Sequence, residues 1–294
     1  MSPTLINRHP WPPKCWSRCA RPGSNPVDAA VRSGAFPILG PPPFILGWDL
    51  SGVVTDVVPG VNRFAVGDEV YGMPMFPRPA GAYAEFAAAP SRQLACNHRT
   101  LDHVHAAALP LAGLTAWQAL VDVAGVQPGQ RVLIHAAGGG VGHLAVQIAK
   151  HLGAEVTATA SASKHRFVRD LGADQIIDYR KVDFTEQVRD VDVVLELVGG
   201  DYGTRSITVL RPGGLLVTVV ERTNAALADR TAAAGRRFAG ITVEPDGAEL
   251  EHLAQLVDDG QLRVHIEHAL PLRDAAKAHA LLATGPPGKT VLTT

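Results

Sequence analysis

Glycines between a strand-like run and a helix-like run are the clearest chemical feature of the sequence. The apolar run Val132–Ile134 has the composition of a strand buried on both faces, and the spacing Ala137-x-Gly139-x-x-Gly142 follows it. Apolar residues then recur at helical spacing. A strand, a glycine turn and a helix can bind a dinucleotide, because backbone N–H groups approach the pyrophosphate at the positive end of the helix. The pattern alone leaves an ordinary turn as the alternative.

The residues after the next predicted strand indicate which dinucleotide the turn would take. That strand is expected over Glu155–Thr159, and an NAD site would place a carboxylate near its end to bond to the adenosine 2′-hydroxyl. The sequence continues instead with Ser161, Ser163, Lys164 and Arg166. Hydroxyls and cations favour a 2′-phosphate, so we predict NADPH over NADH. The alternative is that the two cations only cover the first turn of an exposed helix.

Composition and charge exclude several classes of partner. The 294 residues are 46% hydrophobic, which suffices for two domains, and the formal net charge is −1, without a block of either sign. This balance argues against nucleic acid or an acidic membrane surface. No apolar segment reaches the roughly 20 residues of a bilayer span, and the proline-broken start lacks a secretory core. Cys15, Cys19 and Cys96 make no disulfide framework or zinc site, so we expect a cytoplasmic protein.

Two kinds of hydrophobic pattern divide the chain. Short runs separated by turn residues, at Leu50–Val58, Glu69–Tyr71 and Ala82–Ala88, predict a small, mostly antiparallel β domain. A short helix is expected near Asn25–Arg32, and residues 1–22, which are rich in proline, are expected to be irregular.

From Leu111 onward, helices alternate with buried strands, which predicts a doubly wound parallel sheet and an α/β fold. The expected strands are Val132–Ile134, Glu155–Thr159, Gln175–Ile177, Val191–Leu197, Leu215–Val220 and Ile241–Val243. The glycine turn follows the first of these strands, which is the context that its motif requires.

An ordered set of short motifs makes the chain similar to a known superfamily. Besides the glycine turn, the set contains Asn25-Pro-Val-Asp28, Gly47-x-Asp49-x-Ser-Gly-Val-Val54, Val66-Gly-Asp-Glu-Val70, Gly81-Ala-Tyr-Ala-Glu85, Leu109-Pro110, Gly113-Leu-Thr-Ala-Trp117, Leu171-Gly-Ala-Asp174, Val198-Gly-Gly200, Arg211-Pro-Gly-Gly214 and Gly288-Lys-Thr-Val-Leu292. With these motifs, about residues 24 to 294 resemble the medium-chain dehydrogenase/reductase superfamily, specifically its zinc-free NADPH:quinone oxidoreductase branch. The resemblance implies a GroES-like β domain over residues 1–109, a Rossmann NADPH-binding domain over residues 110–246, and a segment over residues 247–294 that returns to the GroES-like domain.

The resemblance also implies cofactor contacts, residue by residue. Gly139, Gly140 and Val141 would contact the pyrophosphate. Ser161 and Lys164 would contact the 2′-phosphate, and Tyr179 would lie near the adenosine. Asn25, Thr115 and Val198 would lie near the nicotinamide. Zinc-dependent members carry Gly-His-Glu where this chain has Gly47-Trp48-Asp49; Trp48 cannot ligate a metal, so we expect none. A homodimer is also implied, with Ile241–Val243 as an edge strand that could pair with its copy.

These features predict hydride transfer from NADPH to a quinone or an α,β-unsaturated carbonyl. Without zinc, hydrogen-bond donors must polarise the acceptor oxygen. Asn25 and Tyr71 are the candidates, with Trp48 as an apolar wall, although each could instead hold a turn or pack. Many relatives have a tyrosine where this chain has Ala30, so the proton source stays open, and solvent is one candidate. An enoyl-thioester reductase and a non-catalytic NADPH-binding protein are the alternative functions.

The N-terminal segment departs from the pattern of the superfamily. Relatives place a strand like Glu-Val-Leu-Val-Glu-Val-Arg before the Asn25 motif, whereas this chain has Pro13-Lys-Cys-Trp-Ser-Arg-Cys19. Codons for these residues, read two bases along, can encode the expected strand. We therefore hypothesise that residues up to about Arg21 are translated out of frame, which predicts a β domain without its opening strands. Pairing of residues 13–19 as a buried strand would argue against this hypothesis.

Overall fold

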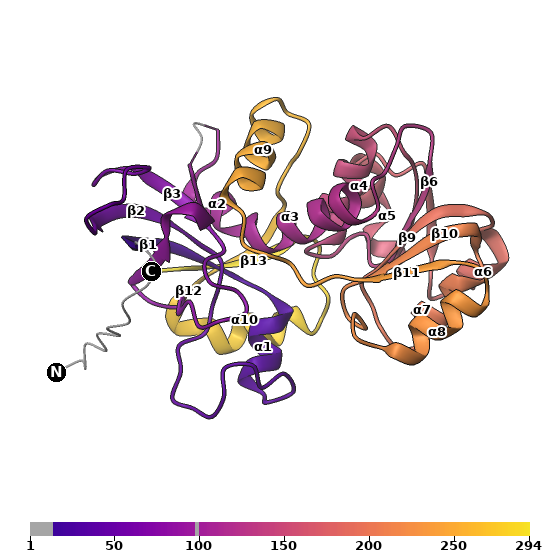
Figure 1. Cartoon of the computed structure of the whole chain (residues 1–294), viewed down its shortest axis with the longest axis horizontal. Helices are drawn as coiled ribbons and strands as arrows, with labels where there is room; N and C mark the ends of the chain where they lie inside the picture. Colours follow the sequence, from indigo (N-terminus) through magenta and orange to yellow (C-terminus); the bar gives the residue numbers. More distant parts are fainter. Residues whose placement is uncertain (1–13, 98–99) are drawn as a thin grey trace.

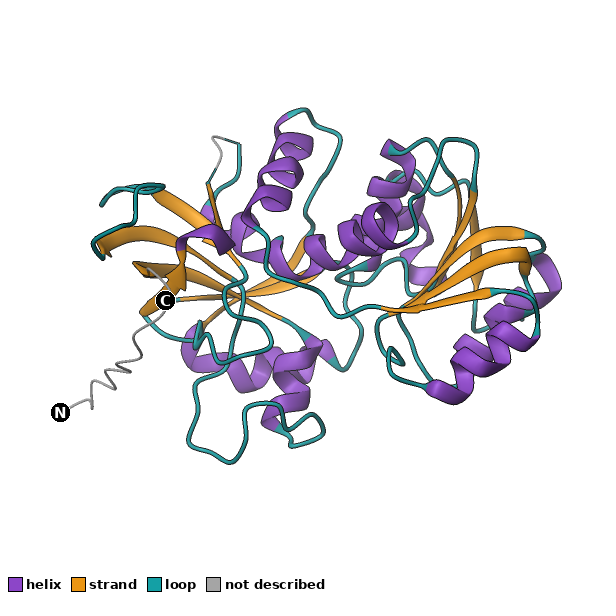
Figure 2. Ribbon diagram, in the orientation of Figure 1, coloured by secondary structure: helices purple, strands orange, loops and turns teal. Residues whose placement is uncertain are grey.

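Two β-sheets, one at each end of the molecule, organise the structure. The computed structural model describes residues 14–97 and 100–294 (Figure 1). The first sheet takes its strands from both ends of the chain, and the second takes them from the middle. Helices α3 (Pro110–Trp117) and α4 (Gly142–His151) lie between the two sheets (Figure 2).

The first sheet has seven strands and is mostly antiparallel. Its strands are β1 (Lys14–Ser24), β2 (Leu50–Val57), β3 (Glu69–Gly72), β4 (Phe86–Pro90), β5 (Leu94–Cys96), β12 (Ile266–Pro271) and β13 (Lys289–Thr293). The order is β12-β13-β1-β2-β3-β5, and β4 pairs with β1. Antiparallel pairing of β1 with β13, in which Ser24 faces Thr290, joins the two ends of the chain in one sheet.

The second sheet is parallel throughout and has six strands. They are β6 (Arg131–Ile134), β7 (Glu155–Ala160), β8 (Gln175–Asp178), β9 (Val191–Glu196), β10 (Leu210–Thr218) and β11 (Arg237–Gly240). The order β11-β10-β9-β6-β7-β8 is that of a doubly wound dinucleotide-binding sheet. The order reverses at β6, so the crevice at its carboxyl end is the place where such sheets bind ligands.

Helices cover both faces of the second sheet and fill the space between the domains. Besides α3 and α4, they are α1 (Pro26–Arg32), α2 (His103–Ala108), α5 (His165–Asp170), α6 (Phe184–Gln187), α7 (Tyr202–Ile207), α8 (Ala225–Ala233), α9 (Gly247–Asp258) and α10 (Ala275–Leu282). Short helical turns occupy Ser91–Gln93, Ala162–Lys164 and Leu272–Asp274, and a π-helical turn at Gln118–Val123 continues α3. Among the described residues, no helix is both long and apolar enough to cross a bilayer.

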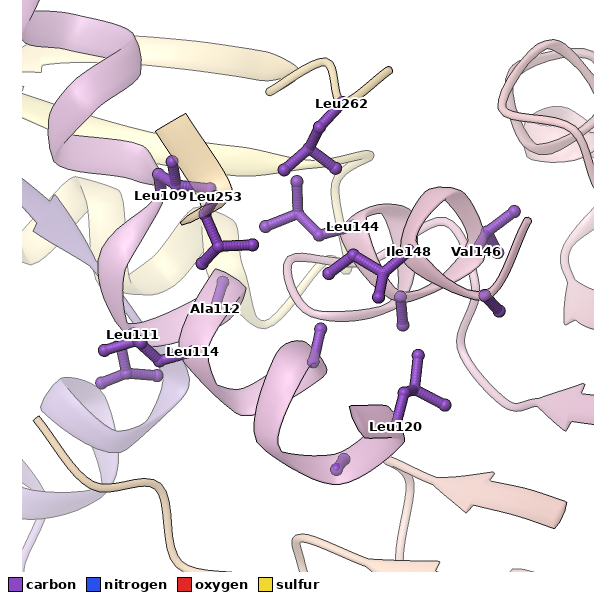
Figure 3. Close-up of a cluster of buried hydrophobic side chains, with 14 of the residues drawn as sticks. Leu109, Leu111, Ala112, Leu114, Leu120, Leu144, Val146, Ile148, Leu253 and Leu262 are labelled. Atoms are coloured by element: carbon purple, nitrogen blue, oxygen red, sulfur yellow. The ribbon is translucent and has the colours of Figure 1, made fainter. Parts of the chain in front are cut away.

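A cluster of buried aliphatic side chains joins the two domains (Figure 3). Leu114 of α3, Leu144 and Ile148 of α4, and Leu253 of α9 are all fully buried in this cluster. Burying a leucine side chain stabilises a fold by about 1.5–3 kcal/mol. This cluster therefore gives the two sheets a common core beside the crevice.

The N-terminal strand corrects one expectation. Residues 14–22 are not irregular, because β1 pairs with β2 from Cys15 to Pro22 and with β4 from Lys14 to Arg18. The β domain therefore has an opening strand, contrary to what the out-of-frame hypothesis predicts. Residues 1–13 of the expected irregular segment lie outside the described residues.

Two other strands lie elsewhere than expected. The last strand of the parallel sheet is β11, which ends at Gly240, just before Ile241–Val243. Ile241 N still donates to Thr218 O of β10 at 3.0 Å, but the segment is not part of the strand. Ile241 and Val243 are buried in the cluster between the domains, which explains their apolar character. In the first sheet, β4 begins at Phe86, because residues 82–85 form a bend in which Tyr83 N donates to Leu46 O.

Candidate active site

A cavity of about 590 Å³ lies between the two domains at the carboxyl end of β6. Its wall includes the start of α1, part of α3, the glycine turn, the ends of β7 and β8, and the segment from α10 to β13. A ligand pocket of a few hundred Å³ at this point is typical of doubly wound sheets.

The glycine turn forms one wall of the cavity and is tightly constrained. Gly142 is the first residue of α4, and a Cβ atom there would lie 2.3 Å from Ala136 O. Only glycine therefore lets the helix start so close to the strand. Gly139 and Gly140 face the cavity without side chains, so their backbone can approach a ligand at the positive end of the helix.

A buried histidine anchors this turn to the C-terminal segment. His143 Nδ1 lies 2.9 Å from Gly139 O, and its Nε2 accepts from His265 N at 3.3 Å. These two bonds require a neutral ring with its proton on Nδ1. Burial lowers the pKa of His143 to about 4, which agrees with the neutral form. The turn is thus held by a group that stays uncharged at neutral pH.

Hydroxyl groups and cations collect at the end of the cavity beyond β7. Ser161 Oγ lies 3.1 Å from Ser163 Oγ, and Lys164 Nζ donates to Gly138 O at 3.3 Å and to Pro286 O at 3.1 Å. Arg180 also lines this part. Burial, with the charge of Arg180 as a smaller cause, lowers the pKa of Lys164. None of the described lining residues carries a carboxylate, so the local chemistry suits an anion.

A buried ion network forms another part of the cavity wall, next to the glycine turn. The Lys289 ammonium is 3% exposed; it donates to Asn25 Oδ1 and lies 3.5 Å from Asp49 Oδ2. Asn25 Nδ2 donates to Asp49 Oδ2 at 2.8 Å, and Leu111 N donates to Asp49 Oδ1 at 2.7 Å. Burial raises the pKa of Asp49 even though Lys289 lowers it. Asn25 and Lys289 also line the cavity, so one face of this network meets the ligand space.

Glu196 shapes the loop beside this network. The side chain is fully buried at the end of β9, and its Oε1 accepts from Val198 N at 2.5 Å and Gly199 N at 2.6 Å. Thr218 Oγ1 donates to the other carboxylate oxygen at 2.8 Å. These bonds fix the backbone of Val198, which lines the cavity opposite Thr115 of α3.

The structure brings together all the residues that the sequence suggested as cofactor contacts. The residues on this one cavity wall are Asn25, Thr115, Gly139, Gly140, Val141, Ser161, Lys164, Tyr179 and Val198. Asn25 also begins α1 in a capping box, so holding a turn and facing the cavity are compatible roles.

Trp48 and Tyr71 lie elsewhere, which corrects the expectation that they form the acceptor site. Both are fully buried and absent from the cavity wall. Tyr71 OH donates to Leu250 O at 2.6 Å, and Trp48 Nε1 donates to Arg78 O at 2.8 Å. Each polar hydrogen is therefore already bonded to backbone inside the protein, and neither is free to polarise a substrate.

Sequence reasoning missed three residues of the site. Ser24 and Lys289 line the cavity, and Glu196 supports it. The only sequence signal for Lys289 is its place in the Gly288-Lys-Thr-Val-Leu292 motif. Lys289 is 264 positions from Asn25, so the sequence alone does not place the two together.

Models of three protein families match the chain and together cover most of it. Residues 18–98 match the alcohol dehydrogenase GroES-like domain, and residues 171–292 match the zinc-binding dehydrogenase family. Residues 106–199 match the C-terminal domain of alanine dehydrogenase/PNT.

Two proteins with sequences similar to this chain differ greatly from each other in length. The chain is 35% identical to a 2-haloacrylate reductase from Burkholderia sp over 87% of its own length and 83% of that protein. It is also 38% identical to the polyketide synthase GfsB from Streptomyces halstedii over 85% of its own length, but this match spans only 4% of the synthase. The chain thus resembles one small part of the synthase.

Two solved structures have the same overall fold. The quinone oxidoreductase of Coxiella burnetii superposes with a TM-score of 0.91 at 38% identity, covering 96% of this chain and 90% of that one. The Escherichia coli quinone oxidoreductase complexed with NADPH superposes with a TM-score of 0.84 at 27% identity, covering 98% of this chain and 95% of that one.

Proposed function

The chain belongs to the medium-chain dehydrogenase/reductase superfamily, in its quinone oxidoreductase branch, and on that premise we propose that it reduces quinones or α,β-unsaturated carbonyls with NADPH and without zinc. The observation that carries the proposal is a single cavity that joins an anion-binding end to a polar buried network. Its volume of about 590 Å³ and a lining that spans the glycine turn, Lys164 and Asn25 suit a dinucleotide better than a small metabolite alone.

The lining residues fit NADPH in their chemistry. Gly139, Gly140 and the start of α4 suit the pyrophosphate, because the glycines have no side chains to block its approach and the helix dipole favours an anion. The Gly139 N–H itself donates to Ala136 O at 2.9 Å. Ser161 and Lys164 suit the 2′-phosphate, because a lysine ammonium and hydroxyls form strong charge-assisted bonds to it. Tyr179, which is 42% exposed at the rim, offers its ring to the adenine.

At the other end, the chain orients the reactants and polarises the acceptor. When bound there, NADPH supplies a hydride from its nicotinamide. Thr115 and the fixed backbone of Val198 hold the reacting ring in place. Asn25 keeps one Nδ2 hydrogen beyond its bond to Asp49, and that hydrogen can donate to the acceptor oxygen. Lys289 and Asp49 hold the amide in this orientation.

Turnover with NADPH and NADH against a quinone and an enone tests the proposal. Wild-type protein should prefer NADPH, and Lys164→Glu should raise the KM for NADPH at least about 10-fold, because a charged hydrogen bond contributes about 1.5–3 kcal/mol. Lys277→Glu makes the same charge change on the exposed face of α10, outside the cavity wall, and should leave that KM unchanged. A wild-type preference for NADH would contradict the cofactor assignment.

The polyketide synthase match favours an enoyl-thioester reductase as a second candidate function. A thioester conjugated to a double bond is attacked by hydride in the same way as an enone. Robust turnover of a 2-enoyl thioester, with none of quinones, would select this function. NADPH binding without oxidation across all three acceptor classes would indicate a non-catalytic NADPH-binding protein.

A further inference from the structure

A chain of three hydrogen-bonded side chains runs from the cavity wall into the β domain. Ser24, at the end of β1, lines the cavity and is 1% exposed. Tyr83 OH lies behind it and donates to Ser24 Oγ at 3.1 Å. On the far side, Tyr83 OH lies 3.1 Å from Nε2 of His279, a buried residue of α10. Each of these groups can both accept and donate a proton, which is the requirement for a relay.

The hydrogen bonds of Tyr83 relate the donor and acceptor roles of Ser24, Tyr83 and His279. When the hydroxyl proton of Tyr83 points to Ser24, the bond to His279 requires Nε2–H as the donor. The Asp28 carboxylate also interacts with this hydroxyl, so a protonated Asp28 favours the orientation toward Ser24. His279 Nδ1 is buried and has no hydrogen-bond partner among the described residues. The imidazole can therefore take up a proton at Nδ1 while its other nitrogen donates toward the cavity.

Charged groups around the chain keep Tyr83 protonated. Asp28 of α1 is fully buried, its Oδ1 has no hydrogen-bond partner among the described residues, and burial raises its pKa to about 7. Burial and the Asp28 charge hold the pKa of Tyr83 well above its usual range. Asp49 contributes in the same direction. Burial, followed by the positive charge of Arg32, lowers the pKa of His279, so the resting ring is neutral and carries a single proton.

The proposed reaction needs a proton at this end of the cavity. Hydride addition to the β-carbon of an enone moves the double-bond electrons toward oxygen and leaves an enolate, which must then be protonated at its α-carbon. On α1, Ala30 offers no proton donor. The hydroxyl of Ser24 lies beside Asn25, the residue that faces the acceptor oxygen in the proposed function.

We propose that Ser24, Tyr83 and His279 form the proton relay of this enzyme; the inference rests on the proposed function. Ser24 Oγ gives its proton to the α-carbon of the enolate, Tyr83 OH reprotonates Ser24, and His279 Nε2 reprotonates Tyr83. As Nε2 gives up its proton, the buried Nδ1 takes one up when local opening of α10 admits water, which leaves His279 as its Nδ1–H tautomer. In total, NADPH is oxidised to NADP⁺ and the enone gains one hydride and one proton. Proton exchange with water then returns His279 to the Nε2–H form before the next turnover.

Single-turnover and steady-state kinetics of Tyr83→Phe and Ser24→Ala test the relay. Both variants should lower kcat for an enone by up to about 100-fold, the lower range for loss of a general acid, with KM for NADPH unchanged. Quinone turnover should change much less, because quinol oxygens take protons from water. In Tyr83→Phe, the solvent deuterium isotope effect on kcat should increase, since protonation becomes rate-limiting. A merely structural role would not change the isotope effect.

Tyr71→Phe is the matched control, because it also removes a buried tyrosine hydroxyl but lies outside the cavity wall. Its enone kcat and isotope effect should match those of wild type. Wild-type kcat and isotope effect in a folded Tyr83→Phe protein would overturn the relay, and so would equal losses in Tyr71→Phe and Tyr83→Phe.

A readout without NADPH separates this inference from the proposed function. In protein with ¹⁵N-labelled histidine, the Nε2 resonance of His279 should shift in Tyr83→Phe and in Ser24→Ala, because both break the chain. No shift in either variant would overturn the relay. If the resonance shifts, but wild-type protein fails to oxidise NADPH with each of the acceptors tested, the proposed function fails while the row of hydrogen-bonded side chains stands.

Discussion

Replacing Lys289 with methionine should destabilise the fold in a pH-dependent way. Breaking a buried ion pair by removing one partner costs about 3–5 kcal/mol. Asp49 would keep its bonds from Asn25 Nδ2 and Leu111 N, and it can also take up a proton, since burial already raises its pKa. We therefore expect Lys289→Met to lose about 3 kcal/mol of unfolding free energy near neutral pH, the low end of that range.

The pH dependence identifies the cause of this loss. Without the ammonium, the folded-state pKa of Asp49 rises further above its usual value. Stability contributed by a raised pKa is present at low pH and is lost as the pH rises through the folded pKa. Urea unfolding should therefore show a larger difference between Lys289→Met and wild type at about pH 8 than at about pH 5.

Two further variants make this test specific. Lys150→Met removes a half-exposed ion pair with Asp174 and should cost at most about 1 kcal/mol at either pH. Adding Asp49→Asn to Lys289→Met should restore much of the lost stability, because no buried charge is then left unpaired. Equal losses at both pH values, or additive effects in the double variant, would refute the reasoning.

Three other predictions follow from buried groups. Gly142→Ala should cost about 1–3 kcal/mol of unfolding free energy and weaken NADPH binding, because its Cβ would meet Ala136 O at 2.3 Å; calorimetry of both properties that matches wild type would contradict this. The unfolding free energy of Asp28→Asn, relative to that of wild type, should rise by up to about 4 kcal/mol between about pH 4 and about pH 8. The reason is that the folded-state pKa of Asp28 is about 7, so wild type loses stability as this carboxyl ionises. A difference in denaturant midpoints that stays constant over this range would be contrary evidence. In the Asp28→Asn background, the contribution of His135 and His143 to stability should rise by about 2–3 kcal/mol per pH unit between about pH 4.5 and 6. Burial lowers their pKa values to about 3 and about 4, so this contribution is lost as the pH falls below 6.5; NMR signals of either imidazole that show a charged ring at about pH 5.5 would disprove this.

Local sequence patterns predicted the glycine turn and the polar residues after β7, because these parts of the site are formed by residues close together in the sequence. The glycine turn, the strand before it and the polar residues after β7 are close in sequence, and each has a fixed place in a doubly wound sheet. Lys164 and Ser161 could therefore be placed near the glycines from their position after the second strand. The doubly wound parallel sheet followed from the same alternation of strands and helices, whereas the strand order and the place of its last strand, β11, came from the structure.

Long-range packing determined the parts that the sequence did not reveal. Tyr71 was predicted to donate a hydrogen bond to the acceptor and Trp48 to form an apolar wall. Only the folded structure shows that both side chains are buried away from the cavity, with Leu250 O and Arg78 O accepting from them. Ile241 and Val243 are apolar because they are buried between the domains, and their spacing cannot be distinguished from that of a strand by composition. Lys289 reaches Asn25 only because β13 pairs with β1, at the opposite end of the chain.

Transfer of deuterium from NADPH labelled at the reactive nicotinamide carbon is the most direct test of the central claim. The purified wild-type chain would be incubated with the labelled cofactor and an enone, and the product would be analysed by mass spectrometry and NMR. We predict one deuterium at the β-carbon of the saturated product, with NADPH consumed in equal amount. NADPH that binds in the cavity but yields neither a labelled product from any enone nor a quinol from any quinone would contradict the account.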